Sequence, residues 1–150
     1  MKKTTIIITF ILITTASALK AQILTPVHWS FAAKKISGNE AVVFFKATID
    51  KGWHLYSQTV QEGGPVKTTF TFPADKDYLI VGKTMEPASI TRFEKAFSIN
   101  VNFFEHEVVF QQKIRMKAGK AIVKGTVEYM TCNDRKCLPP EDVSFSVAVR

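Results

Sequence analysis

Two cysteines, Cys132 and Cys137, are the residues of this 150-residue sequence best suited to covalent chemistry. They are the only cysteines of the chain, and the four residues between them are polar or charged. If they face each other across this short loop, their Cα atoms lie about 4.5 to 5.5 Å apart, which is compatible with a disulfide. The sequence therefore predicts a pair that changes between dithiol and disulfide with little backbone movement.

A purely structural disulfide is the alternative to a redox-active one. A bridge that closes so short a loop removes little entropy from the unfolded chain, so it stabilises less than a bridge between distant strands. This favours redox use and leaves the structural interpretation open. Arg135 and Lys136 favour the thiolate that attacks disulfides, whereas Asp134, Glu141 and Asp142 oppose it.

Metal binding is a third interpretation. Met130, Cys132 and Cys137 could supply soft sulfur ligands for Cu(I). A methionine next to a strand more often packs inward, however, and the three histidines of the chain do not have zinc-finger spacing. We therefore expect neither a metal nor any other cofactor.

The N-terminal segment has the pattern of a secretory signal peptide. Two lysines precede an apolar run at residues 6–13, and small residues follow it. This predicts a signal peptide over residues 1–21, cleaved after Ala18 or Ala21. A membrane anchor is the alternative, but the run is shorter than the about 20 apolar residues that span a bilayer.

Residues 22–150 are expected to form one domain with its own core. Cleavage after Ala21 would lower the formal charge from +7 to about +4. The remaining lysines and arginines are scattered and form no basic block with interleaved aromatics, which argues against nucleic-acid binding. We expect a soluble domain outside the cytoplasm, where disulfides persist.

Short apolar stretches separated by turn signals run through this domain, and none has the pattern of an amphipathic helix. Residues 86–95 contain Pro87 and have mixed polarity, so they are expected to form a loop. About eight strands with turns every eight to twelve residues predict an antiparallel, immunoglobulin-like β-sandwich, although a small barrel has the same periodicity. The expected strands are residues 27–32, 41–49, 68–72, 78–81, 101–104, 108–114, 121–129 and 143–149.

Three motifs resemble the N-terminal periplasmic domain of DsbD-type thiol:disulfide interchange proteins, a protein-disulfide reductase family. The most specific combines residues 129–132 with residues 137–141 and is similar to the active-site hairpin of that domain. Residues 52–56 resemble its Gly-aromatic-x-Leu-Tyr turn, and residues 93–97 resemble its cap loop. The resemblance covers essentially the whole chain after the signal peptide, in the same order.

The resemblance implies an all-β, immunoglobulin-like periplasmic domain that relays reducing equivalents. Members of the family receive electrons from a thioredoxin-like domain fed by a membrane-embedded domain. They pass them to thioredoxin-fold proteins such as disulfide isomerases and cytochrome c maturation factors. For this chain we expect thioredoxin-fold electron donors and acceptors, a separate membrane electron-transfer protein as a further partner, and a monomer that does not bind nucleic acid.

The resemblance also implies roles for individual residues. Cys137 would form the mixed disulfide with a partner, and Cys132 would resolve it. The cap aromatic over the pair would be Phe97, with Phe93 as the second candidate. The other residues expected to line the site are His54, Tyr56 and Tyr129.

The sequence departs from the family pattern in two places and in extent. The loop between the cysteines is one residue shorter than in the best-known members. Lys95 and Ala96 precede Phe97 where the family has an acidic pair, which weakens the case for acidic tuning of the thiols from the cap. The sequence contains neither the membrane domain nor the thioredoxin-like domain, so we expect a stand-alone domain that works with separate proteins.

Overall fold

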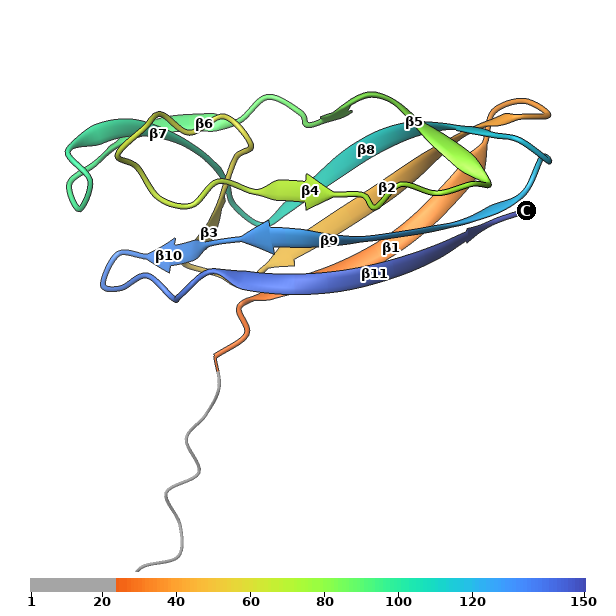
Figure 1. Cartoon of the computed structure of the whole chain (residues 1–150). Coiled ribbons are helices and arrows are strands. Elements are labelled where there is room, and N and C mark those ends of the chain that lie inside the picture. Colours follow the sequence, from red (N-terminus) through yellow and green to blue (C-terminus); the bar gives the residue numbers. More distant parts are fainter. Residues whose placement is uncertain (1–23) are drawn as a thin grey trace, which may run out of the picture.

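The computed structural model describes residues 24–150, which contain β-strands, turns and loops (Figure 1). The predicted signal peptide lies outside these residues, and within them no helix is long and apolar enough to cross a membrane. The strands are β1 (Val27–Lys35), β2 (Glu40–Ile49), β3 (Trp53–Tyr56), β4 (Thr69–Thr71), β5 (Tyr78–Met85), β6 (Ile90–Glu94), β7 (Ile99–Phe104), β8 (Glu107–Met116), β9 (Ala121–Tyr129), β10 (Thr131–Asn133) and β11 (Glu141–Val149).

The strands form three antiparallel sheets. A four-stranded sheet, in the order β1-β2-β8-β5, packs against a three-stranded sheet, in the order β11-β9-β4. A second four-stranded sheet, β10-β3-β7-β6, lies at one end of this sandwich (Figure 1), and we call it the end sheet. These sheets confirm the predicted all-β, immunoglobulin-like sandwich.

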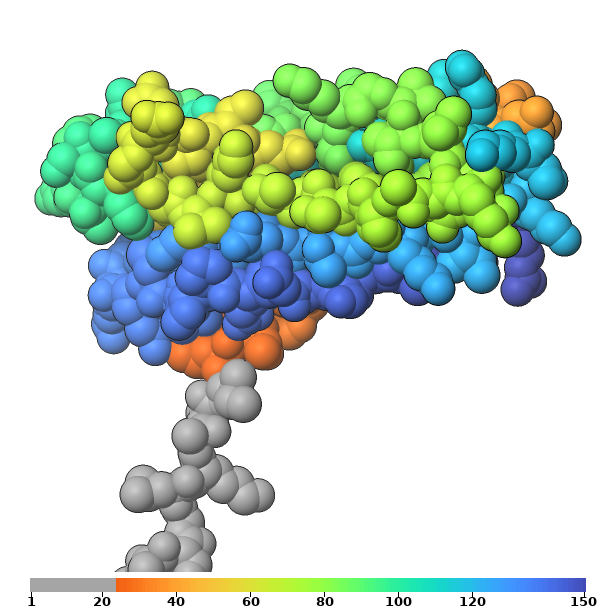
Figure 2. Space-filling view, in the orientation of Figure 1, coloured from red at the N-terminus to blue at the C-terminus, as the bar shows by residue number. Residues whose placement is uncertain are grey.

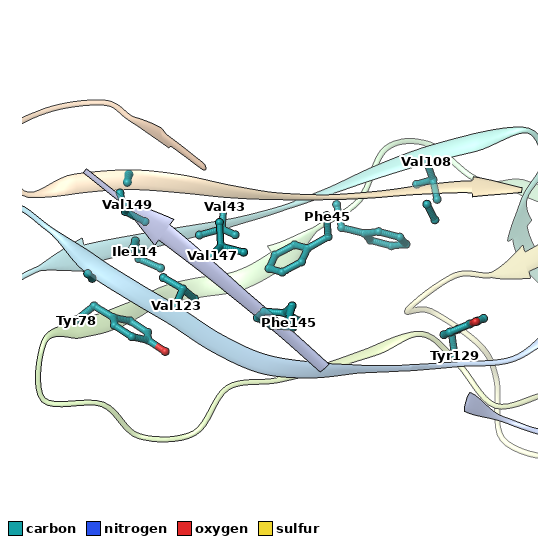
Figure 3. Packing of buried hydrophobic residues seen from close by; sticks show 14 of the residues in the cluster. Val43, Phe45, Tyr78, Val108, Ile114, Val123, Tyr129, Phe145, Val147 and Val149 are labelled. Atoms are coloured by element: carbon teal, nitrogen blue, oxygen red, sulfur yellow. The ribbon is translucent and has the colours of Figure 1, made fainter. Parts of the chain in front are cut away.

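The main core lies between the two sheets of the sandwich. Alternate residues of β2 and β8 are buried there, because successive side chains of a strand point to opposite faces of its sheet. Phe45 of β2 is fully buried and points toward Phe145 of β11 (Figure 3). Its ring packs against the rings of Phe31, Phe70 and Phe145, with centroids 4.7 to 6.0 Å apart.

Strand β6 is the main difference from the fold expected from the sequence. The predicted loop at residues 86–95 contains this strand, which pairs with β7 along its whole length. β6 is at the edge of the end sheet, and four of its five residues are exposed. An edge strand exposed on both faces needs no alternation of polar and apolar residues, so its sequence carries no strand signal. The expected cap loop, residues 93–97, is therefore the end of β6 and part of the turn that joins it to β7.

Candidate functional site

Cys132 and Cys137 form a disulfide across a tight turn. Their Cα atoms are 4.0 Å apart, which is closer than the sequence predicts. Backbone hydrogen bonds join the residues on either side of the pair, including one from Asn133 N to Lys136 O of 2.9 Å. The cysteines are thus the non-hydrogen-bonded pair of an antiparallel bridge, in which Cα atoms approach most closely.

The side chain of Asn133 shapes the turn between the cysteines. Its Oδ1 accepts hydrogen bonds from the backbone N–H groups of Arg135 and Lys136, both at 2.9 Å. In such an Asx turn, a short side chain takes the place of a backbone acceptor. The chain therefore reverses within four residues and leaves the charged side chains of residues 134–136 exposed.

The two cysteines differ in their access to solvent. Cys132 is 2% exposed, whereas Cys137 is exposed. Both line a hollow of about 510 Å³, whose other wall is formed by residues 92–96 of β6 and the turn after it. Figure 2 shows these two regions, teal and blue, together at one end of the molecule. A disulfide of another protein can therefore approach Cys137 directly, whereas Cys132 is covered.

The pairing of β10 with β3 determines what lies beside Cys132. In this register Cys132 is directly opposite His54, and Thr131 is opposite Leu55. Because side chains alternate between the faces of a sheet, His54 and Tyr56 share the face of Cys132, while Leu55 faces the main core. The structure thus brings two of the residues expected at the site, His54 and Tyr56, to the inner cysteine.

A second, smaller apolar cluster surrounds Cys132, and we call it the cysteine cluster. Its buried members are Tyr56, Val101, Phe103 and Cys132, and Phe97 is among the half-buried residues that pack against it. The ring of Phe97 lies edge-on to that of Tyr56, with centroids 6.5 Å apart. The side chain of Cys132 therefore packs against apolar side chains that are separate from the main core.

The two phenylalanines expected at the cap occupy different positions. Phe93, on β6, is 58% exposed and lines the hollow together with both cysteines. Phe97, the first choice from the sequence, is half-buried against the cysteine cluster and is not part of the wall of the hollow. The β6–β7 hairpin therefore places Phe93 in the wall of the hollow and Phe97 against the cysteine cluster.

Tyr129 does not lie with the other residues expected at the site. It is buried in the main core, and its hydroxyl donates a hydrogen bond to Glu141 Oε2 at 2.7 Å. Alternation along this segment explains the difference, because Tyr129 and Thr131 face the core while Cys132 faces the other way. Burial and the carboxylate of Glu141 raise the pKa of Tyr129 well above its usual value, so its phenol stays neutral.

Charged side chains surround the mouth of the hollow. Arg92, Lys95, Arg135 and Lys136 line it together with the carboxylates of Glu94 and Asp134. The guanidinium of Arg92 lies 4.6 Å from the centroid of the Phe103 ring, a cation–π contact. Sequence reasoning did not identify Arg92, because this contact depends on cross-strand packing in a segment predicted to be a loop. Within residues 24–150, no group of three or more His, Cys, Asp or Glu side chains is arranged to hold a metal ion.

His54 is a buried titratable group next to the disulfide, with only 3% of its surface exposed. Its Nε2 lies 3.2 Å from Tyr56 Oη, and its ring packs against Phe103 with centroids 4.9 Å apart. Burial disfavours the charged imidazolium and lowers the pKa of His54 below its ordinary value of 6.5. Burial also raises the pKa of Tyr56 to about 12. Both side chains are therefore neutral at pH 7.

The lowered pKa of His54 predicts a loss of stability in mild acid. Above pH 6.5 His54 is neutral in both the folded and the unfolded chain, so it adds no pH dependence. Below 6.5 the unfolded chain takes up the proton first, so the free energy of unfolding falls until the pH is below the folded-state pKa. Urea unfolding of the oxidised protein at a series of pH values measures this. We expect a weaker fall between pH 6.5 and the folded-state pKa in His54→Gln, and an equal fall in both proteins would contradict the assignment.

Comparisons with known proteins place the chain among similar domains. The family model for the N-terminal region of the thiol:disulfide interchange protein DsbD matches residues 20–148. The reduced N-terminal domain of DsbD from Neisseria meningitidis has a TM-score of 0.54 and 16% identity, covering 87% of this chain and 94% of that one. The N-terminal periplasmic domain of ScsB from Proteus mirabilis has a TM-score of 0.60 and 17% identity, covering 87% of this chain but only 49% of that one.

A third similar structure is the complex between the DsbD N-terminal and PilB N-terminal domains from Neisseria meningitidis. It has a TM-score of 0.52 and 17% identity, and covers 83% of this chain and 87% of that one. At these identities the structures show the shared fold, and no curated protein matches the chain. Family membership rests on the sequence match, which spans nearly the whole chain and includes the disulfide. The chain therefore belongs to the family of N-terminal domains of DsbD-type thiol:disulfide interchange proteins.

Proposed function

We propose that this domain relays reducing equivalents between thioredoxin-fold proteins in the periplasm through Cys132 and Cys137. The thiolate of Cys137 attacks a partner disulfide, a Cys137–partner bond forms, and the second partner sulfur leaves as a thiolate. Cys132 then attacks Cys137 Sγ, which restores the intramolecular disulfide and releases the first partner sulfur. The cysteine pair loses two electrons and the partner gains two. A reduced thioredoxin-fold donor reverses these steps and reduces the Cys132–Cys137 disulfide back to the dithiol.

The unequal exposure of the two cysteines is the observation that carries this proposal. Exchange needs one sulfur that a partner can reach and a second that is held beside it but shielded from the partner. Both cysteines line the hollow, but Cys137 is exposed there whereas Cys132, bonded to it, is only 2% exposed. A disulfide that only stabilises the fold would not need an open hollow beside it.

The relatives support the choice of partner and location. One similar structure is a complex of the DsbD N-terminal domain with a domain of another protein, PilB, and the ScsB domain is described as periplasmic. The sequence pattern of a signal peptide at residues 1–21 agrees with export. We accordingly propose thioredoxin-fold donors and acceptors, and a membrane electron-transfer protein at the start of the relay.

The reduction potential of the pair tests the proposal against a structural disulfide. We expect a value near that of thioredoxin, about −270 mV, from equilibration with redox buffers followed by quantification of free thiols. We also expect reduction to lower the free energy of unfolding by only about 2 kcal/mol, because the closed loop is very short. A potential well below about −300 mV, together with a large loss of stability, would instead indicate an interaction module with a structural disulfide.

A further inference from the structure

The second step of the exchange requires Cys132 to lose a proton in a covered position. Only the thiolate attacks a disulfide, and a thiol in apolar surroundings resists ionisation. Cys132 is 2% exposed within the cysteine cluster, so little water reaches its sulfur. A group inside the protein that accepts this proton would remove that obstacle.

His54 is the side chain in the right place to accept this proton. It is directly opposite Cys132 in the β10–β3 register and on the same face of the end sheet. The Cβ atoms of such cross-strand partners lie about 4.5 to 5.5 Å apart. Its ring packs against Tyr56 and Phe103, which both belong to the cluster around Cys132. The imidazole and the thiol therefore share one buried environment.

His54 is also in the right ionisation state. Burial keeps its imidazole neutral at pH 7, so one of its two ring nitrogens carries a lone pair. When Nε2–H donates to Tyr56 Oη, the lone pair is on Nδ1. Burial and, after it, Arg92 disfavour the imidazolium, while Glu94, Glu105 and Asp134 favour it. These carboxylates partly oppose the effect of Arg92 on a transient imidazolium.

We propose that His54 is the base that takes the proton from Cys132 during resolution of the mixed disulfide. This inference rests on the proposed function. The proton passes from Cys132 Sγ to the imidazole, and the Cys132–Cys137 bond forms as the bond from Cys137 to the partner breaks. The partner sulfur leaves with the electron pair as a thiolate. The imidazolium then returns its proton to that thiolate or to water, so atoms and charge balance.

Reaction of the reduced protein with 5,5′-dithiobis(2-nitrobenzoate) separates the two steps. Attack by Cys137 releases the first equivalent of coloured thiolate, and attack by Cys132 on the resulting mixed disulfide releases the second. Stopped-flow absorbance therefore records two phases. Cys132→Ser is expected to release a single equivalent, which assigns the second phase to Cys132.

Replacement of His54 should slow the second phase alone. In His54→Gln we expect a first phase within about twofold of the wild-type rate and a second phase slowed by about 100-fold, the usual contribution of a positioned base. His28→Gln is the matched control, because His28 is exposed on β1, pairs with Asp50, and belongs neither to the wall of the hollow nor to the cysteine cluster. It should change neither phase. Equal second-phase rates in His54→Gln and wild type would overturn the proposal.

The pH profile of the unaltered protein gives a test that does not depend on the folding of a variant. The second-phase rate should fall as the pH drops through the pKa of His54. Its midpoint should match the NMR titration of the His54 ring in the nitrobenzoate adduct of Cys132→Ser. A profile without that midpoint would also overturn the role of His54. If the wild-type protein releases only one equivalent, the proposed relay itself fails, so the two failures are distinguishable.

Discussion

Cys132→Ala is expected to accumulate a covalent complex with a thioredoxin variant. This thioredoxin retains only its exposed active-site cysteine, which is first converted to a mixed disulfide with 2-nitro-5-thiobenzoate. The thiolate of the exposed Cys137 attacks the thioredoxin sulfur, the protein–protein disulfide forms, and 2-nitro-5-thiobenzoate leaves as a thiolate. With no second thiol on either protein, nothing resolves it, so the yield should approach one complex per molecule. Wild type should release thioredoxin and show almost no complex. Non-reducing electrophoresis and intact-mass spectrometry measure the outcome.

Cys137→Ala is the matched variant for this trap, since it also retains a single thiol. It should form almost no complex, because its remaining cysteine, Cys132, is 2% exposed. A double variant without either cysteine controls for non-covalent association, and dithiothreitol should dissolve the complex. Comparable complex formation by both single variants would contradict the assignment of Cys137 as the attacking residue. Failure of both would contradict the relay.

Phe45→Ala is expected to cause the largest loss of stability of any single substitution considered. Phe45 is fully buried, and its ring contacts aromatic rings from three other segments of the chain. Removal of a buried phenyl ring leaves a cavity and costs about 3 to 5 kcal/mol. This is a large part of the about 5 to 15 kcal/mol that stabilises a typical domain. Urea unfolding followed by circular dichroism measures the change.

Phe93→Ala provides the control with the same chemistry at an exposed position. Phe93 is 58% exposed, so its truncation should change the free energy of unfolding by less than about 0.5 kcal/mol. A loss below about 1 kcal/mol in Phe45→Ala would show that the main core is not organised around this ring. An equal loss in both variants would show that the β6–β7 hairpin carries stability that its exposure does not indicate.

The fold was predictable because most strands have one buried face. β2 and β8 alternate between buried and less buried residues although their sequences do not alternate strictly, whereas in β11 the apolar residues themselves recur at every second position. β6 has no buried face, so nothing in its composition separates it from a loop. Hydrophobic periodicity indicates which strands have a buried face, and it gives no signal for an exposed edge strand such as β6, which is held by backbone pairing and polar side-chain contacts.

The site was predictable only as far as chemistry and resemblance reach. Two cysteines at short spacing predict a disulfide, and the structure contains this disulfide. The position of His54 opposite Cys132 depends on the register between two strands that are far apart in the chain, which no local pattern encodes. The resemblance ranks Phe97 before Phe93, but the wall of the hollow contains Phe93 because the cap is a paired hairpin.

The five-residue separation of the cysteines also limits how far folding can set the reduction potential. Folding and reduction form a thermodynamic cycle. The free energy of unfolding is higher for the oxidised form than for the reduced form. By the same amount, the disulfide is harder to reduce in the folded protein than in the unfolded chain. About 2 kcal/mol from so small a ring corresponds to only about 40 mV. The rest of the potential is therefore that of the same two cysteines in the unfolded chain. A substitution near the sulfurs that shifts the folded potential by about 30 mV must change the stability difference between the oxidised and reduced forms by about 1.4 kcal/mol.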